Sequence, residues 1–150
     1  MNAVPRSALV LGLAGLLPFL WGVATFLMDP LALWTIRTIG PRFVAPFVIL
    51  NYGSIILAFM SGVLWGFATR AAPSRAPMAY ALSVLPALWA FFFVGAGPEA
   101  SAINLIAGYV GLLMLDWTYA RQGLAPSWWM SLRIPLTLGV IACLTTVALL

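Results

Sequence analysis

The carboxyl groups of this sequence are few and widely separated. Asp29 and Glu99 stand beside prolines at breaks between apolar runs, whereas Asp116 lies inside such a run. General acid–base catalysis and metal ligation need titratable groups that cluster in one place, and the chain has no histidine and no lysine to join these three. The absences argue against a zinc site, a His-ligated haem and a Schiff-base cofactor. We therefore expect a protein that is not an enzyme and that holds no cofactor or metal.

The single cysteine, Cys143, lies within the apolar stretch "LGVIACLTTVALL". One cysteine cannot form a disulfide within the chain. Because cysteine in apolar surroundings behaves as a small hydrophobic side chain, we interpret Cys143 as a packing residue rather than a reactive thiol.

Asp116 has a candidate partner of opposite charge, Arg133, on the next apolar segment. The connection between them, "YARQGLAPSWWMS", is short enough to make the flanking helices antiparallel neighbours. Because a lone charge is costly in a helix that crosses a membrane, we predict an ion pair of Asp116 with Arg133 that clamps the two helices together. Arg121 competes for the carboxylate but points away from it along the same helix. The alternatives are a proton-carrying or ligand-binding Asp116, and an unpaired aspartate exposed to water.

Polar side chains also interrupt the apolar run "NYGSIILAFMSGVLWG" at residues 51–66. Asn51 and Tyr52 lie near one end of this run, and Asn104 lies at a similar depth in a later one. Since an amide that faces lipid is costly, we expect these three residues to form a polar cluster in which hydrogen bonds join the helices. A polar ligand pocket at this level is the alternative.

The composition places these residues in a membrane. The chain has 150 residues, of which 64% are hydrophobic and 7% are charged, and its mean hydropathy is +1.09. Such values lie outside the range of soluble globular domains. The net charge of +4 comes from arginines that are dispersed among apolar runs, which argues against nucleic-acid binding. The lipid bilayer is therefore the first partner that we predict.

Five apolar segments have, or approach, the length that a helix needs to cross the hydrocarbon core. Turn sequences such as "GP" and "APSRAP" separate them, and no connection is long enough for a soluble domain. We predict an all-α membrane protein, with a single integral membrane domain over residues 1–150 that forms a bundle of five transmembrane helices. Pro18 and Pro86 should kink two of them. The predicted spans are residues 8–28, 46–68, 78–95, 100–120 and 132–150.

The arginines in the connections indicate the orientation of these spans. If the N-terminus is cytoplasmic and the C-terminus external, only Arg37 and Arg42 lie outside, and five arginines lie inside: Arg6, Arg70, Arg75, Arg121 and Arg133. Four tryptophans then gather at the cytoplasmic boundary, where such rings prefer to lie: Trp65, Trp117, Trp128 and Trp129. Trp34 would mark the outer boundary on a short surface-lying helix at residues 31–37.

Small residues recur at every fourth position of the second span. Ser54, Ala58, Gly62 and Gly66 form a stripe along one helix face, and such stripes allow membrane helices to approach closely. We predict that this stripe packs against the other spans, which makes residues 46–68 the central helix of the bundle. A ligand cavity beside the stripe is the alternative.

Four blocks of the sequence resemble, in order, one family of small multispanning proteins. They are "ALVLGLAGLLPFL" at residues 8–20, "YGSIILAFMSGVLWG" at 52–66, "SVLPALWAF" at 83–91 and "LDWTYARQGLAPSWWMSLRIPLT" at 115–137. The family is domain of unknown function 3429, which also contains the mitochondrial transmembrane protein 69. The resemblance implies an integral inner-membrane protein of bacterial type, and it implies no defined activity.

Two functions of different classes fit these features. The favoured hypothesis is a non-enzymatic protein that binds partner subunits or a second copy of itself, and so helps to assemble or stabilise a membrane complex. The alternative is a binder or transporter of a small hydrophobic or porphyrin-like ligand. The chain is similar in size, span count and tryptophan content to the tryptophan-rich sensory proteins, although it lacks their aromatic–proline signature. We expect a multi-pass protein of the bacterial inner (cytoplasmic) membrane.

Overall fold

The computed structural model describes residues 3–149, and the regular secondary structure in this range is helical. Residue 150, the predicted end of the last span, lies outside the described residues. In chain order the helices are α1 (Arg6–Ala14), α2 (Leu17–Leu27), α3 (Asp29–Thr38), the short 3-10 helix η1 (Pro41–Phe43), α4 (Phe47–Ala68), α5 (Ala76–Ser83), α6 (Leu85–Phe93), α7 (Pro98–Arg121) and α8 (Trp129–Leu149).

Five helical units in the described range are long and apolar enough to cross a membrane, as predicted. Three are the single helices α4, α7 and α8; the other two are pairs of helices joined at a break, α1 with α2 and α5 with α6. Their lengths of 18 to 24 residues correspond to about 27–36 Å at 1.5 Å per residue, and the hydrocarbon core is about 30 Å thick. The prediction of an all-helical protein is confirmed, and so is that of five helical units with the length and apolar character that a span needs.

Both breaks lie just before the prolines at which the sequence predicts kinks. Because Pro18 has no N–H, it cannot donate to the carbonyl of Ala14, and α1 ends at that residue. The chain then tightens, so that the Leu16 N–H bonds the Leu13 carbonyl at 3.0 Å, one residue closer than in an α-helix. Pro86 follows the break between α5 and α6 in the same way.

A serine from another span satisfies a backbone donor at the second break. Ser61 lies buried on α4, and its hydroxyl oxygen accepts a hydrogen bond from the N–H of Ala87 at 2.8 Å. The first turn of a helix leaves its N–H groups without partners in the same helix. The break in the neighbouring span therefore explains why Ser61, a polar residue, lies inside the apolar run at 51–66.

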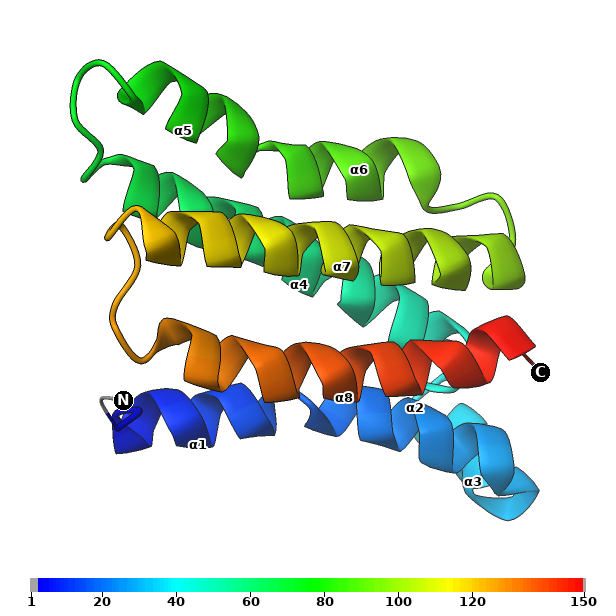
Figure 1. Ribbon diagram of the computed structural model, residues 1–150. Helices are drawn as coiled ribbons and strands as arrows, with labels where there is room; N and C mark the ends of the chain where they lie inside the picture. The colour runs from blue at the N-terminus through cyan, green and yellow to red at the C-terminus, as the bar shows by residue number, and fades with distance from the viewer. Residues whose placement is uncertain (1–2, 150) are drawn as a thin grey trace.

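The spans pack with α7 and α8 side by side and antiparallel, joined by a short loop (Figure 1). In this view α4 lies behind α7, and it contacts α2, α5, α6 and α7. The second span is therefore the central one, as predicted. The broken helix α5–α6 covers one side of the bundle, and α1–α2 runs along the far side of α8. The two termini lie at opposite ends of the bundle (Figure 1).

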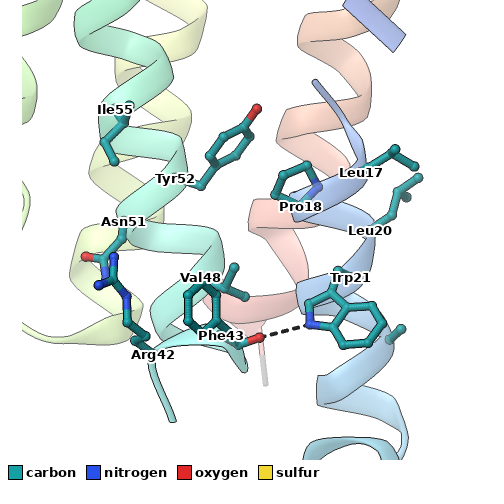
Figure 2. A pocket seen from close by; sticks show the side chains of 11 residues that line it. Leu17, Pro18, Leu20, Trp21, Arg42, Phe43, Val48, Asn51, Tyr52 and Ile55 are labelled. Atoms are coloured by element: carbon teal, nitrogen blue, oxygen red, sulfur yellow. Dashed lines mark hydrogen bonds between the residues drawn. The ribbon is translucent and has the colours of Figure 1, made fainter. Parts of the chain in front are cut away.

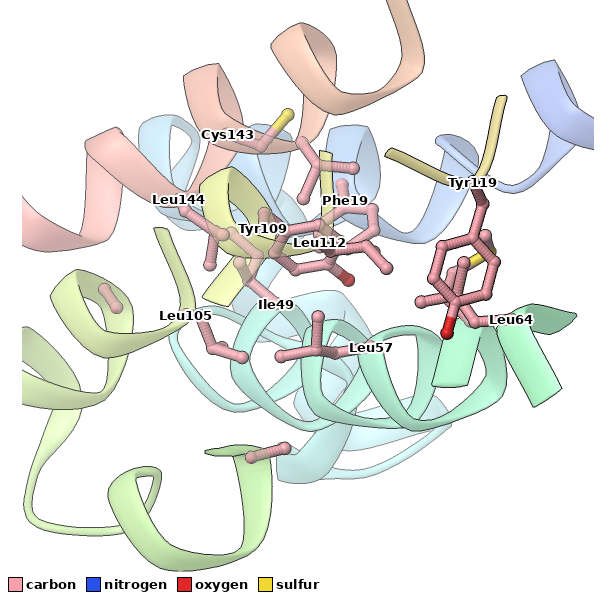
Figure 3. Close-up of a cluster of buried hydrophobic side chains, with 14 of the residues drawn as sticks. Phe19, Ile49, Leu57, Leu64, Leu105, Tyr109, Leu112, Tyr119, Cys143 and Leu144 are labelled. Carbon is pink, nitrogen blue, oxygen red and sulfur yellow. The ribbon is translucent and has the colours of Figure 1, made fainter. Parts of the chain in front are cut away.

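Large buried side chains from α2, α4, α7 and α8 meet in the centre of the bundle (Figure 3). Tyr109 of α7 is 1% exposed, and its hydroxyl donates to the carbonyl of Gly53 on α4 at 2.7 Å. The Tyr119 hydroxyl, at the other end of α7, donates to the carbonyl of Ala79 on α5. Cys143 is buried in the same cluster, where it packs as expected. The tyrosines add polar links to an otherwise apolar core.

The face through which α4 packs is not the predicted one. Ser54 is half-buried, and Ala58, Gly62 and Gly66 are exposed. A methyl group added at Gly62 or Gly66 would meet no atom of another helix within 4 Å. The prediction that this stripe packs within the bundle is therefore wrong. The buried positions of α4 are Ile49, Gly53, Leu57, Met60, Ser61, Leu64 and Ala68.

Close approach between the spans depends on other glycines. A Cβ at Gly108 of α7 would lie 2.8 Å from a methyl carbon of Leu57 on α4, and one at Gly22 of α2 would lie 2.3 Å from Cγ1 of Ile49. The large side chains of α4 thus fit against glycines on its neighbours. A four-residue spacing of small residues within α4 carries no information about isolated glycines on the facing helices, and this is why the predicted face failed.

The connection between the first two spans contains the short helix expected around Trp34. The helix α3 has Asp29 in its first turn and Arg37 in its last, which is the charge order that the helix dipole favours. Pro30 stands at its start, a position that tolerates the missing N–H. Trp34 is 52% exposed. The helix therefore presents a large aromatic ring on the surface just outside the spans.

Candidate functional site

A buried carboxylate with two donors connects α7 to α8. Asp116 of α7 is 0% exposed. Arg133 of α8 donates from Nε to Oδ2 of Asp116 at 2.8 Å, and Trp129 donates from Nε1 to Oδ1, also at 2.8 Å. The structure thus joins Asp116 and Arg133 in the ion pair that the sequence predicts, and it contradicts the alternative of an unpaired aspartate exposed to water. Arg121 is exposed at the end of α7.

Trp129 is the member of this site that the sequence reasoning missed. It lies four residues before Arg133 on α8, so the two side chains share one helix face, and this spacing was the available signal. Each carboxylate oxygen of Asp116 has its own donor, which fixes the orientation of the group. Removing one partner of a buried ion pair is strongly destabilising, by about 3–5 kcal/mol, because the other charge is left uncompensated. The geometry therefore suits a clamp between α7 and α8.

A small cavity adjoins the arginine of this ion pair. It has a volume of about 150 Å³ and lies between the α1–α2 break, α4 and α8. Arg133 and Thr137 line it, and two of their buried polar atoms, Nη2 of Arg133 and Oγ1 of Thr137, have no hydrogen-bond partner. Buried polar groups are nearly always hydrogen-bonded in native proteins. These two atoms are therefore unsatisfied polar groups on residues that line a mostly apolar cavity, to which Tyr109 of α7 also contributes.

The predicted polar cluster of Asn51, Tyr52 and Asn104 does not form. The amide of Asn104 on α7 donates from Nδ2 to the carbonyl of Phe93 at 2.7 Å, where α6 ends. Trp89 of α6 donates to the main-chain carbonyl of Asn104, also at 2.7 Å. Asn104 thus bonds α6, because the unpaired carbonyls at a helix end attract a side-chain donor. No hydrogen bond among residues 3–149 joins it to Asn51 or Tyr52.

Asn51 and Tyr52 line a larger crevice between α2, η1 and α4, with a volume of about 750 Å³. In Figure 2, Pro18 and Trp21 of α2 form one wall, and Val48 and Tyr52 of α4 form the other. The Trp21 indole closes one edge by donating to the Phe43 carbonyl at 3.0 Å. Arg42 supplies the single charge in an otherwise mostly apolar lining. The crevice combines apolar walls with polar groups at one edge.

These features define the class of the protein: a small all-helical membrane protein with five candidate spans and a buried ion pair between the last two. Within residues 3–149, no group of three His, Cys, Asp or Glu side chains is placed to hold a metal ion. The chain belongs to the family described as "Protein of unknown function (DUF3429)", which matches residues 4–149. The resemblance that the four sequence blocks suggest is confirmed.

Two relatives are similar to nearly the whole chain. Transmembrane protein 69 of Xenopus tropicalis is 33% identical over 148 residues, covering 94% of this chain and 53% of the relative. Transmembrane protein 69 of Mus musculus is 29% identical over 138 residues, covering 89% of this chain and 52% of the relative. The chain thus spans about half the length of these curated relatives. No solved structure matches it.

Proposed function

We propose that this protein is non-enzymatic and binds a transmembrane helix of a partner subunit, or of a second copy of itself, and so helps to assemble or stabilise a membrane complex. One observation carries the proposal. The small-residue face of α4, defined here as Ala58, Gly62 and Gly66, is exposed although α4 is the central helix of the bundle. This face has the composition of a helix interface and no helix of the described chain covers it.

The argument rests on what small residues do in a bilayer. Lipid tails are as apolar as leucine, so membrane helices associate through close backbone approach, which small side chains permit. A glycine within a helix costs about 0.5–1 kcal/mol relative to alanine. Gly62 and Gly66 have no neighbour within this chain that would require them. A partner helix that packs on the nine-residue track from Ala58 to Gly66, about 12 Å long, would explain both glycines.

Substitution of Gly62 by leucine tests this proposal. The variant should keep the fold, because the position is open, and it should lose its partner when purified from native membranes in mild detergent. Gly111→Leu is the matched control, since a Cβ at Gly111 would also meet no atom within 4 Å, although this residue lies half-buried on α7. We expect the parent and the Gly111 variant to retain a stable partner or dimer. A parent that purifies as a lone monomer would contradict the proposal.

We also infer a cytoplasmic N-terminus and an external C-terminus in the bacterial inner membrane, within a single integral domain. Four arginines support this orientation, because they lie at helix ends or in connections at the end of the bundle where α1 begins (Figure 1): Arg6, Arg70, Arg75 and Arg121. Arg37 lies in the last turn of α3, at the opposite end of the bundle. Short cytoplasmic connections are enriched in arginine and lysine. Helical spans suit the inner membrane because outer-membrane proteins of bacteria are typically β-barrels.

A second candidate function, binding or transport of a hydrophobic or porphyrin-like ligand, is favoured by the crevice between α2 and α4. Its apolar walls suit a flat hydrophobic molecule, and Arg42 and Asn51 at its edge suit that molecule's polar groups. Titration with protoporphyrin IX should quench tryptophan fluorescence, and Trp21→Phe should remove part of the quenching. Trp34→Phe is the control, because Trp34 lies outside this crevice on α3. Equal effects of the two variants would speak against a ligand here.

A further inference from the structure

The two unpaired donors beside the ion pair point to a binding site that is separate from the small-residue face of α4 and from the crevice between α2 and α4. Arg133 is 5% exposed and Thr137 is 1% exposed. Both residues line the cavity of about 150 Å³, and their buried atoms Nη2 and Oγ1 have no hydrogen-bond partner. The residues lie four positions apart on α8, so the two side chains share one helix face. Two neighbouring residues of the cavity lining thus each have a hydrogen-bond donor to spare.

The net charge beside the cavity favours an uncharged hydrogen-bond acceptor as the ligand. The positive charge of Arg133 is already balanced by Asp116 through Nε at 2.8 Å, so the cavity borders a neutral pair. An anionic ligand would bring an uncompensated negative charge into an apolar interior, which is costly. A carbonyl oxygen accepts hydrogen bonds without adding charge. The preferred ligand group is therefore a ketone, quinone or ester carbonyl.

Apart from Tyr109, the other residues that line the cavity are apolar, and the cavity opens towards lipid. Phe19 and Met60 are among its buried walls, while Leu11 of α1 and Phe59 of α4, which also line it, are 73% and 64% exposed. The opening lies between α1 and α4, and α1 has no buried residue of its own. A cavity of roughly this volume accommodates a benzene-sized group. Its entrance is thus reached from the lipid-facing surface of the spans.

We propose that this cavity binds the uncharged carbonyl head of a molecule dissolved in the bilayer. The carbonyl oxygen accepts hydrogen bonds from Nη2 of Arg133 and Oγ1 of Thr137, and the apolar remainder of the molecule extends into the lipid between α1 and α4. Lipid esters and membrane quinones share the required carbonyl chemistry.

The experiment uses the full chain in lipid nanodiscs and three probes. Methyl laurate represents acyl esters, tetramethyl-1,4-benzoquinone represents quinones, and laurate is the charged comparison. Dissociation constants are measured, and the infrared band of a ¹³C-labelled carbonyl reports its hydrogen bonding. We expect at least one neutral probe to bind with its carbonyl band shifted to lower frequency, and laurate to bind more weakly. Which neutral probe binds distinguishes an ester from a quinone as the natural source.

Three variants of α8 locate the bound carbonyl. Thr137→Val removes the hydroxyl at nearly constant volume and should weaken binding about five-fold, the equivalent of one neutral hydrogen bond, while Thr137→Ser should retain binding. Thr145→Val is the control, because its hydroxyl bonds the Ile141 carbonyl of the same helix at 2.7 Å. An unfolding temperature at or above that of the parent shows that Thr137→Val is folded. Absent binding of both neutral probes, equal binding in Thr137→Val, or preferred binding of laurate would each overturn the proposal.

Discussion

Replacing Asp116 by asparagine should destabilise the bundle by an amount that the structure allows us to estimate. The change removes the counter-charge of Arg133, whose side chain is 6% exposed. Breaking a buried ion pair costs about 3–5 kcal/mol. Arg133 lies four residues from Trp129, about 6 Å along α8, so its long side chain can turn towards the membrane boundary and recover part of this cost. We therefore expect a loss of about 3 kcal/mol.

The assay is equilibrium unfolding in mixed micelles of a mild detergent and sodium dodecyl sulfate, followed by tryptophan fluorescence. Glu99→Gln is the matched control, because it removes an exposed negative charge from the first turn of the same helix. Its expected cost is at most about 1 kcal/mol, from the helix dipole alone. Exchanging Asp116 and Arg133 should recover part of the loss, since the ion pair can form again while the Trp129 donor no longer faces a carboxylate.

Replacing both Asp116 and Arg133 by leucine should lower the free energy of unfolding less than Asp116→Asn does, because the interior then contains no uncompensated charge. The reasoning fails if the asparagine variant is as stable as the glutamine control. If that variant also loses a ligand or a proton-coupled activity, Asp116 is a functional residue rather than a clamp.

Three further predictions follow from the packing and the topology. Gly22→Ala should destabilise the bundle by about 1–3 kcal/mol, because its Cβ would lie 2.3 Å from buried Ile49, whereas Gly111→Ala, in open space, should be neutral or slightly stabilising in the same unfolding assay. Leu57→Ala should lower the free energy of unfolding by about 2–5 kcal/mol, whereas Gly62→Leu should leave that of the single chain nearly unchanged. A larger loss in Gly62→Leu than in Leu57→Ala would show that the small-residue face of α4 packs within the bundle after all. A reporter enzyme fused to the C-terminus should be active only when external, and activity confined to the cytoplasm would invert the orientation.

The number of spans and the pairing of Asp116 with Arg133 could be predicted because both depend on properties that a sequence states directly. Hydropathy and length define a span, and a short connection forces the two flanking helices to be antiparallel neighbours. The kinks at Pro18 and Pro86 were predictable for the same reason, since a missing N–H acts locally. None of these inferences requires knowing which face of a helix meets its neighbour.

The packing face and the polar cluster needed that knowledge. The periodic spacing of Gly62 and Gly66 indicates that something approaches α4, but it does not say whether that helix belongs to the same chain. Asn104 found its acceptor at the end of α6, a partner created by tertiary packing. The cavity beside Thr137 depends on the gap that the α1–α2 break leaves in the bundle, and such a gap has no signature in the sequence.

The ion pair between α7 and α8 also has a consequence for the order in which the chain enters the membrane during synthesis. Of the five candidate spans, α7 has the lowest mean hydropathy, 1.4, against 1.9 for α8, and each of the two contains one buried charge. Inserted alone, either would place that charge in lipid at a cost of up to about 2.5–3.5 kcal/mol. Inserted together as a hairpin, they bring the opposite charges in as a neutral pair. We expect α7 to wait at the translocon until α8 has emerged from the ribosome, so a chain truncated after residue 125 should leave α7 poorly inserted in a glycosylation-mapping assay, whereas efficient insertion of that truncated chain would contradict the idea.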